Sequence, residues 1–322
     1  MSEPVAPNEQ EPETGHIIDG NATAAELGTQ LAAEVAALSA RQFRPGLATV
    51  LVGDEYTALA YERRVRRLAD RLSFHYVSET LSGDVEEADV LAIVGKLNAD
   101  PRVSGILILR PLPGQITEAD VFRTLDPGKD IEAVHPVNAG RLALGQPRFV
   151  PSTPASCYHL LDHYLEASGR DPGSFYQGRT IVVVGRSNNV GKPAILLGLA
   201  RGAIVVSCDE HAFRAGRLRE FTRQADVLIV AAGVPGLVGA DDVRPGAIVI
   251  DVGINPVRDG GSGRVRLVGD VDFEAVRPRA EAISPVPGGV GPVTDVWLLH
   301  NTVIAAKLAA EQGPASYTTS AW

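Results

Sequence analysis

The segment "VVVGRSNNVGKP" (182–193) reads as a buried strand, a tight turn and the first residues of a helix. Gly185 permits the turn, and Gly191 allows the helix to approach the strand closely. Free N–H groups at the start of such a helix suit a diphosphate. The spacing is G-x-S-x-x-x-G and not G-x-G-x-x-G. It therefore predicts either a nucleotide site, flanked by Arg186 and Ser187, or an ordinary strand-to-helix turn.

Two acidic residues, Asp209 and Glu210, follow the next apolar run, about twenty residues after the glycine loop. Dinucleotide-binding folds place a carboxylate there to accept hydrogen bonds from the adenosine ribose. These acids would repel a 2′-phosphate, whereas Arg186 and Ser187 could bind one. The two acids favour NAD, with NADP second; the alternative is a solvated strand end without a ligand.

Apolar runs and amphipathic segments alternate along the chain, which predicts an α/β fold with mostly parallel strands. The run "GLATVLVG" (46–53) is typical of a strand buried on both faces. We expect two lobes, an N-terminal α/β catalytic lobe and a Rossmann-like dinucleotide-binding lobe. Their predicted limits are 15–155 and 156–284, with a helix at 292–311 returning to the first lobe and disordered or frayed tails at 1–14 and 312–322.

Composition narrows the class of protein. Of the 322 residues 45% are hydrophobic, which is enough to build sizeable cores. The 30 basic and 39 acidic side chains give a net charge of −9, which argues against nucleic-acid or membrane partners. No apolar run is long enough to cross a bilayer. Cys157 and Cys208 lack metal-ligand spacing and indicate reduced thiols in a cytoplasmic protein, with no metal site.

The segment "AYERRVRRLADRL" (60–72) is a charged amphipathic helix that contains five arginines and no lysine. Val65 follows Tyr61 by four residues, which places both side chains on one face. The segment is either a solvated helix or one wall of an active site that has lost its base.

Several segments together are similar to the bifunctional methylenetetrahydrofolate dehydrogenase/cyclohydrolase family. They are "VVVGRSNNVGKP", "KDIEAVHPVNAGRL", "PSTP", "DVGIN", "GDVDF" and "PVPGGVGPVT". The resemblance implies two lobes around a cleft, a tetrahydrofolate derivative as the small-molecule substrate, a nicotinamide dinucleotide, and a homodimer. It also implies a cofactor role for Ile254 and Thr294, and a substrate-binding role for the loop residues Pro287, Gly288, Gly289, Val290 and Gly291.

The chain departs from this family's pattern at the one-carbon site. Tyr61 is kept, but Val65 stands at the lysine position four residues later. Leu109 stands at the position of a glutamine and is followed by Arg110, and Glu132 replaces the pterin-binding aspartate. We expect Tyr61 and Glu132 to be catalytic and all five residues to bind the substrate.

These departures affect the two reactions of the family differently. Hydrolysis of the methenyl carbon needs a group that exchanges a proton, which valine lacks and arginine, being always protonated, supplies poorly. Hydride transfer needs alignment more than acid or base. We therefore expect an NAD(P)-dependent methylenetetrahydrofolate dehydrogenase whose cyclohydrolase activity is lost or severely weakened. The alternatives are a repurposed paralogue acting on a related one-carbon unit or imine, and a nucleotide- or folate-binding protein without turnover.

Overall fold

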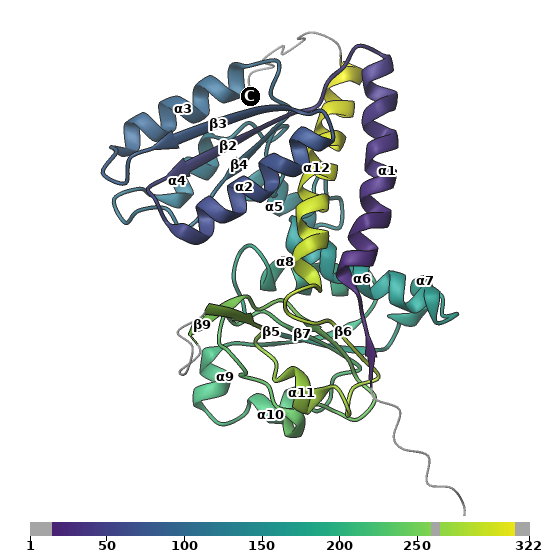
Figure 1. The fold of residues 1–322 in the computed structure, drawn as a ribbon. Coiled ribbons are helices and arrows are strands. Elements are labelled where there is room, and N and C mark those ends of the chain that lie inside the picture. The colour runs from purple at the N-terminus through teal and green to yellow at the C-terminus, as the bar shows by residue number, and fades with distance from the viewer. Residues whose placement is uncertain (1–14, 259–264, 313–322) are drawn as a thin grey trace, which may run out of the picture.

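The computed structural model describes residues 15–258 and 265–312, which form two lobes joined by long helices (Figure 1). The predicted tail at 1–14 lies outside the described residues, and so does the predicted tail at 312–322 apart from Gln312, which is the last residue of a helix. An α/β architecture with a smaller sheet and a Rossmann-like sheet agrees with the fold class predicted from the sequence.

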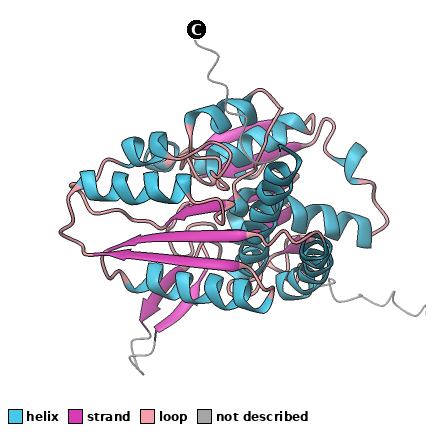
Figure 2. Cartoon of the chain, turned by 90° about the horizontal axis from the view of Figure 1, so that it is seen from above, coloured by secondary structure: helices cyan, strands magenta, loops and turns pink. Residues whose placement is uncertain are grey.

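The N-terminal lobe is built on a parallel three-stranded sheet in the order β3–β2–β4. All seven residues of the central strand β2 (Gly46–Val52) are buried, as its uninterrupted apolar run predicts. Figure 2 shows helices on both faces of the strands. The other elements of this lobe are β3 (His75–Leu81), β4 (Gly105–Ile108), α2 (Tyr56–Arg71), α3 (Glu87–Ala99), α4 (Glu118–Thr124) and α5 (Pro136–Ala143).

The second lobe contains a six-stranded parallel sheet in the order β1–β11–β8–β7–β5–β6. Its strands are β1 (His16–Ile17), β5 (Thr180–Val184), β6 (Ile204–Cys208), β7 (Val227–Val230), β8 (Ile248–Asp251) and β11 (Ala282–Ile283). A separate antiparallel pair is formed by β9 (Asn255–Arg258) and β10 (Val265–Val268). The short helices are α8 (Gly191–Ala200), α9 (Glu210–Arg214), α10 (Leu218–Thr222), η1 (Ala240–Asp242) and α11 (Phe273–Val276).

The lobe limits differ from the prediction in two places. Strand β1 pairs with β11, so residues 16–17 belong to the Rossmann sheet and not to the first lobe. The predicted limit between residues 155 and 156 falls inside α6 (Ser152–Ala167), which packs against both α12 and α8 and is followed by α7 (Pro172–Phe175). A two-residue strand has no periodicity, and a helix shared by two lobes shows no break in sequence.

Helices α1 (Gly20–Ala40) and α12 (Val290–Gln312) run side by side from the Rossmann lobe to the N-terminal lobe (Figure 1). Helix α12 packs against α1 and α6 and against α2, β2 and β4 of the N-terminal lobe. The buried Asn301 amide fixes it there by donating hydrogen bonds to the carbonyl oxygens of Ile131 and Val150, at 2.8 and 2.7 Å. Among the described helices, none is both long and apolar enough to span a membrane.

Candidate active site

Glu132 is the acidic group of the predicted one-carbon site. Its two carboxyl oxygens face the backbone N–H of Ser152, at 3.2 and 3.4 Å. Burial raises the pKa of this carboxyl from 4.5 to about 7, and the hydrogen bonds from Ser152 and the nearby Arg110 guanidinium oppose that rise. Glu132 is therefore poised to change its charge near neutral pH.

Tyr61, on α2, is close enough to two acids, Glu132 and Asp295, for their charges to act on its hydroxyl. Burial raises the pKa of its hydroxyl well above the ordinary value, and the charges of Glu132 and Asp295 raise it further. The guanidinium carbon of Arg64 lies 5.2 Å from the centroid of the Tyr61 ring. Tyr61 and Glu132 are thus close enough for the charge of one to affect the other. With its raised pKa, the Tyr61 hydroxyl stays protonated and can donate a hydrogen bond.

Val65 and Leu109 are buried in the hydrophobic core. Their exposed fractions are 0% and 3%, and they pack in the same cluster as Ala133. Arg110 lies with its guanidinium carbon 5.5 Å from the ring centroid of Phe122. Where the family pattern has lysine and glutamine, this chain therefore has an apolar wall; direct contact of these residues with a substrate stays a prediction.

An ion pair that the sequence did not predict joins α2 to α12 beside Tyr61. Arg64 Nε and Nη2 donate to the two carboxyl oxygens of Asp295, at 2.6 and 3.2 Å. The Asp295 side chain is only 10% exposed; burial raises its pKa, and Arg64 opposes this. The one available signal was an acid inside the apolar run "GPVTDVWLL", but its partner is distant in the sequence.

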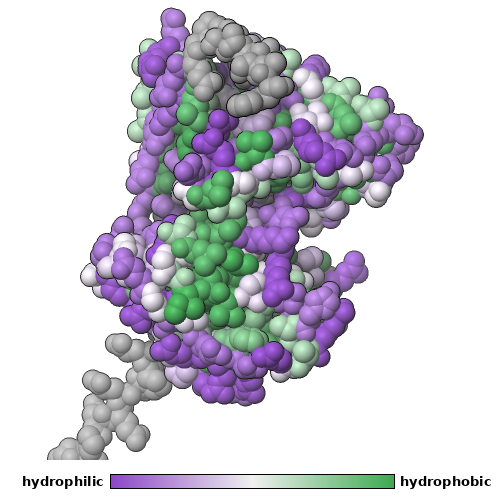
Figure 3. All heavy atoms as spheres, turned by 180° about the vertical axis from the view of Figure 1, so that it is seen from behind, coloured by the Kyte–Doolittle hydropathy of each residue, from purple (hydrophilic) through white to green (hydrophobic). Residues whose placement is uncertain are grey.

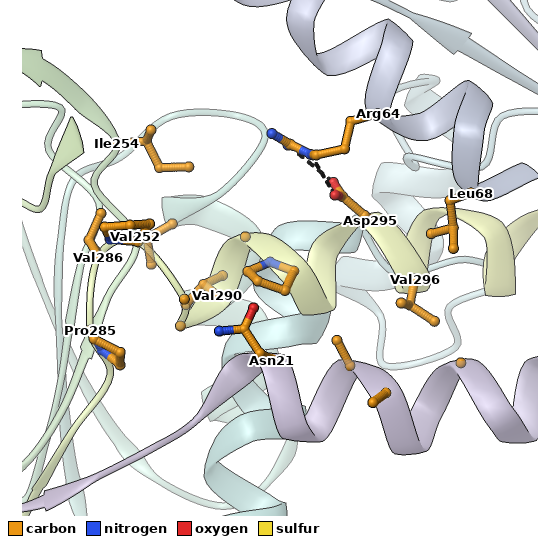
Figure 4. Close-up of a pocket in the computed structure, with 18 of the residues that line it drawn as sticks. Asn21, Arg64, Leu68, Val252, Ile254, Pro285, Val286, Val290, Asp295 and Val296 are labelled. Atoms are coloured by element: carbon orange, nitrogen blue, oxygen red, sulfur yellow. Dashed lines mark hydrogen bonds and ion pairs between the residues drawn. The ribbon is translucent and has the colours of Figure 1, made fainter. Parts of the chain in front are cut away.

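A cavity of about 990 Å³ opens between the lobes next to this ion pair (Figure 4). Ile254, which is 55% exposed, lines it from the Rossmann lobe. The predicted loop residues Pro287, Gly288, Gly289, Val290 and Gly291 line it too. Arg64 and Asp295 lie at its wall, and Arg64 also lies against the Tyr61 ring. Tyr61 and Glu132 themselves are not among the residues that line the cavity.

The glycine loop between β5 and α8 has no room for side chains at its two glycines. Gly185 has a φ of +109°, and a Cβ there would lie 2.1 Å from the Ala231 carbonyl oxygen. A Cβ on Gly191 would lie 2.1 Å from the oxygen of Gly185. Ser187 Oγ accepts the Val190 N–H at 3.2 Å, and the buried Asn189 Oδ1 has no partner among the described residues. This close-packed helix start fits the diphosphate of a dinucleotide.

At the end of β6, Arg186 and Asp209, which the sequence predicts as separate cofactor ligands, form an ion pair with each other. Arg186 Nη1 donates to Asp209 Oδ2 at 2.8 Å, and its other nitrogens donate to Ser207. Asp209 also caps α9 by accepting the N–H groups of His211 and Ala212. Glu210 instead pairs with Arg214, so the structure separates the two acids that the sequence placed together.

Two further predictions concern the cofactor side and metal ions. Thr294 is buried, and its hydroxyl donates to the Val290 oxygen at 3.0 Å, within the first turns of α12. Its cofactor contact stays a prediction.

In residues 15–258 and 265–312, no three His, Cys, Asp or Glu side chains are grouped so as to hold a metal ion.

Two family models match almost the whole described chain. The tetrahydrofolate dehydrogenase/cyclohydrolase catalytic domain matches residues 18–132, and the NAD(P)-binding domain of the same family matches residues 151–310. Bifunctional protein FolD 3 of Rubrobacter xylanophilus is 67% identical over 300 residues, which cover 93% of this chain and 94% of that protein.

Solved structures agree with these matches. A FolD methylenetetrahydrofolate dehydrogenase/cyclohydrolase from Campylobacter jejuni is 36% identical with a TM-score of 0.82, covering 91% of this chain and 98% of that one. The Trypanosoma brucei enzyme, solved with NADP and an inhibitor, is 34% identical with a TM-score of 0.85, covering 92% and 99%. The chain belongs to the tetrahydrofolate dehydrogenase/cyclohydrolase family of enzymes.

Proposed function

We propose that this enzyme oxidises methylenetetrahydrofolate with a nicotinamide dinucleotide and has lost most or all of the cyclohydrolase activity of its family. The loss of cyclohydrolase activity is inferred from the positions of the lysines. The chain has only four, and the lysine position of the family pattern is occupied by the fully buried Val65.

Each of the four lysines is engaged away from Tyr61 and Glu132. Lys96 and Lys307 pair with Glu79 and Glu34, at 3.4 and 2.8 Å. Lys129 donates to three backbone carbonyl oxygens at the end of α3, and Lys192 donates to Asn188 in the glycine loop. No lysine ammonium is therefore placed to exchange a proton with a water that attacks a methenyl carbon.

The oxidation itself requires no acid or base from the side chains, only alignment of the substrate and the nicotinamide. A bound nicotinamide would accept the hydride, with its electron pair, from the methylene carbon of the substrate. Tyr61 offers a ring surface and a protonated hydroxyl to hold the substrate, and the Glu132 carboxylate can accept the donor hydrogens of a pterin. The Pro287–Gly291 loop lines the space between the lobes in which the two reactants would be aligned.

The direct test is a pair of assays on the unmodified protein. We expect reduced nicotinamide to appear with methylenetetrahydrofolate and NAD, and methenyltetrahydrofolate to be hydrolysed no faster than in buffer. Tight dinucleotide binding without turnover would instead favour a repurposed or non-catalytic paralogue. Brisk hydrolysis of the methenyl substrate would contradict the argument from the lysines.

Rebuilding the family pattern should restore hydrolysis only when all its parts are present. Val65→Lys alone should add little, because position 65 is fully buried and Leu109, at the glutamine position, cannot offer the new ammonium a polar partner. Val65→Lys with Leu109→Gln and Glu132→Asp should raise methenyl hydrolysis at least about tenfold, a barrier change of about 1.4 kcal/mol. Loss of methenyl absorbance, corrected for the uncatalysed rate, measures it, and Leu109→Gln with Glu132→Asp is the control without lysine.

The raised pKa of Glu132 predicts a pH dependence of kcat/KM. Above about pH 7 the group is a carboxylate and can accept hydrogen bonds from the pterin; as the pH falls through that value it takes up a proton. Dehydrogenase kcat/KM should therefore fall below pH 7 with one apparent pKa near that of Glu132. Glu132→Gln cannot titrate and should give a lower, flat profile between pH 6 and 8. A Glu132→Gln profile that still falls below pH 7 would assign the titration to another group.

We also propose that NAD is preferred over NADP. The Arg186 guanidinium is already paired with Asp209, and three of its five N–H donors are used on Asp209 and Ser207, so a 2′-phosphate would have to compete with this carboxylate for the cation. The NADP in the Trypanosoma brucei relative favours the opposite preference. Dissociation constants for both cofactors at one ionic strength decide between them.

The variant Asp209→Ser isolates this carboxylate. Serine is also a good N-cap, so α9 should keep its start while Arg186 is released. We expect the ratio of the NADP to the NAD dissociation constant to fall about tenfold, about 1.4 kcal/mol. Glu210→Ser is the matched control, because that acid pairs with Arg214 instead. An equal shift in both variants would indicate general electrostatics and not the Arg186 pair.

We further propose a cytoplasmic homodimer formed through the Rossmann lobe. Both cysteines are buried and free, as expected of a reducing compartment. Strand β6 is an edge of the sheet, and Ile204 on it and Leu199 on the adjacent α8 are 56% and 53% exposed. Figure 3 shows hydrophobic side chains gathered on this lobe.

Light scattering at micromolar concentration should give twice the chain mass of 34.0 kDa; the mass of one chain would contradict the dimer.

A further inference from the structure

Glu62 places a carboxylate on the buried side of α2. It is 7% exposed, and the other buried residues of the helix are Ala58, Val65 and Ala69. Within residues 15–258 and 265–312, Glu62 forms no ion pair. A buried carboxylate without a cation costs stability, and an apolar residue of similar size would avoid that cost. The stability of the fold therefore does not explain a glutamate at this position.

Hydroxyl groups of the neighbouring strands hold the Glu62 carboxylate in place. Its Oε1 atom accepts hydrogen bonds from the hydroxyls of Tyr76, at 3.1 Å, and Ser78, at 3.0 Å, both on β3. The Tyr76 hydroxyl also lies 3.1 Å from Oγ1 of Thr49, a fully buried residue of β2. Burial raises the pKa of the Tyr76 hydroxyl, so this group stays protonated. Because its one proton is donated to Glu62, Thr49 donates to Tyr76.

These hydrogen bonds cross the interface between α2 and the sheet. Side chains alternate between the two faces of a strand, so Thr49 shares one face of β2 with Leu47 and Leu51. Both leucines pack in the same hydrophobic cluster as Val65 of α2. Strand β3 lies next to β2 in the sheet, and α2 contacts both strands (Figure 1). The carboxylate thus joins α2 to the strands beneath it.

The rotation of α2 about its own axis determines where Tyr61 points. Successive residues of a helix are about 100° apart, so Tyr61 and Glu62 lie on opposite sides of Val65. On the Tyr61 side, Arg64 is hydrogen-bonded to Asp295 of α12. On the other side, Glu62 is hydrogen-bonded to β3. Apolar contacts are not directional, whereas hydrogen bonds are, so these two polar contacts fix the rotation of the helix with Tyr61 between them.

We propose that Glu62 is a positioning residue for the oxidation: its carboxylate, held by the β3 hydroxyls, sets the rotation of α2 and thereby the placement of Tyr61 against the substrate. This inference rests on the proposed function, because it assumes that Tyr61 holds the substrate. Glu62 does not line the cavity between the lobes, and it acts only through the helix. Hydride transfer depends on alignment, and a displacement of about 1 Å can slow a reaction about a hundredfold.

Glu62→Leu tests this role because leucine fills the space without accepting a hydrogen bond. We expect kcat/KM for methylenetetrahydrofolate to fall at least about tenfold and the NAD dissociation constant to stay unchanged. The thermal unfolding midpoint should stay the same or rise, since an apolar side chain replaces an unpaired buried charge. A lower midpoint with unchanged kcat/KM would show a merely structural role and overturn the inference.

Glu62→Gln is the conservative variant. Its side-chain Oε1 can still accept from the hydroxyls of Tyr76 and Ser78, so kcat/KM should stay within about threefold of the unmodified protein. A loss as large as that of Glu62→Leu would show that the charge matters and not the hydrogen bonds, which would contradict the proposed role.

Glu79→Leu is the matched control. Glu79 also joins β3 to a helix, through Lys96 of α3 at 3.4 Å, but it lies on the opposite face of the strand. We expect this variant to keep its kcat/KM. An equal loss in Glu79→Leu and Glu62→Leu would indicate general damage to the lobe, and the specific role of Glu62 would be rejected.

Removal of the two donors gives an independent test, which also decides the question if Glu62→Leu does not fold. Tyr76→Phe combined with Ser78→Ala leaves the Glu62 carboxylate without partners, so kcat/KM should again fall at least about tenfold, with a lower unfolding midpoint. Adding Glu62→Leu should cause no further loss of kcat/KM, because all three changes break one network. Unchanged kcat/KM in the Tyr76→Phe/Ser78→Ala variant, or a further multiplicative loss on adding Glu62→Leu, would overturn the inference.

Calorimetric binding of tetrahydrofolate separates this inference from the proposed function. If the unmodified protein forms no reduced nicotinamide, but Glu62→Leu and not Glu79→Leu weakens tetrahydrofolate binding, the oxidation is rejected and the positioning role stands. Turnover of methylenetetrahydrofolate that Glu62→Leu leaves unchanged rejects the positioning role alone. Failure of the unmodified protein to bind tetrahydrofolate would overturn both.

Discussion

The two hydrogen bonds of the Asn301 amide determine the geometry of the site. They join α12 to Ile131 and Val150, two carbonyls that come from distant parts of the chain. The residue after Ile131 is Glu132, and two residues after Val150 is Ser152, whose N–H faces the Glu132 carboxyl. One buried side chain on the returning helix thus fixes both the acid and its donor. Because an unsatisfied buried carbonyl costs roughly 1–3 kcal/mol, this arrangement resists displacement.

Burial has the largest effect on the charge of Glu132, one of the residues at which the chain departs from the family pattern. Val65 and Leu109, which stand at the lysine and glutamine positions of that pattern, are themselves buried in the hydrophobic core. An apolar surrounding disfavours the carboxylate, and burial is the main cause of its raised pKa. Arg110 compensates only in part. Burial thus gives Glu132 a pKa near neutrality in a chain that has no lysine at the family position.

Features that depend on residues close together in the sequence, such as single strands, turns and helices, could be predicted from local patterns. The glycine loop, the buried strand β2 and the return of the C-terminal helix all follow from apolar runs, turn residues and periodicity. Long-range pairings could not be predicted in this way. The pairs β1–β11 and Arg64–Asp295 each join residues more than 200 positions apart, and nothing near either partner marks the other. The pairing of Arg186 with Asp209 is likewise not marked in the sequence, because the two residues are on different elements and each alone has the chemistry of a nucleotide ligand.

Pairing of arginines with acids also explains why a site that has lost its lysine remains suited to hydride transfer. Removal of a hydride from the methylene carbon of the proposed substrate leaves positive charge on the folate, so a nearby cation would oppose the reaction. The Arg64 guanidinium lies over the Tyr61 ring, and Asp295 neutralises it through two hydrogen bonds. Above its pKa, Glu132 adds a negative charge near Tyr61, which Arg110 offsets in part. A preorganised carboxylate next to developing positive charge lowers the barrier, and more so in a site that excludes water. Under the proposed function, the substitutions that remove hydrolysis leave the site with an electrostatic balance that favours oxidation.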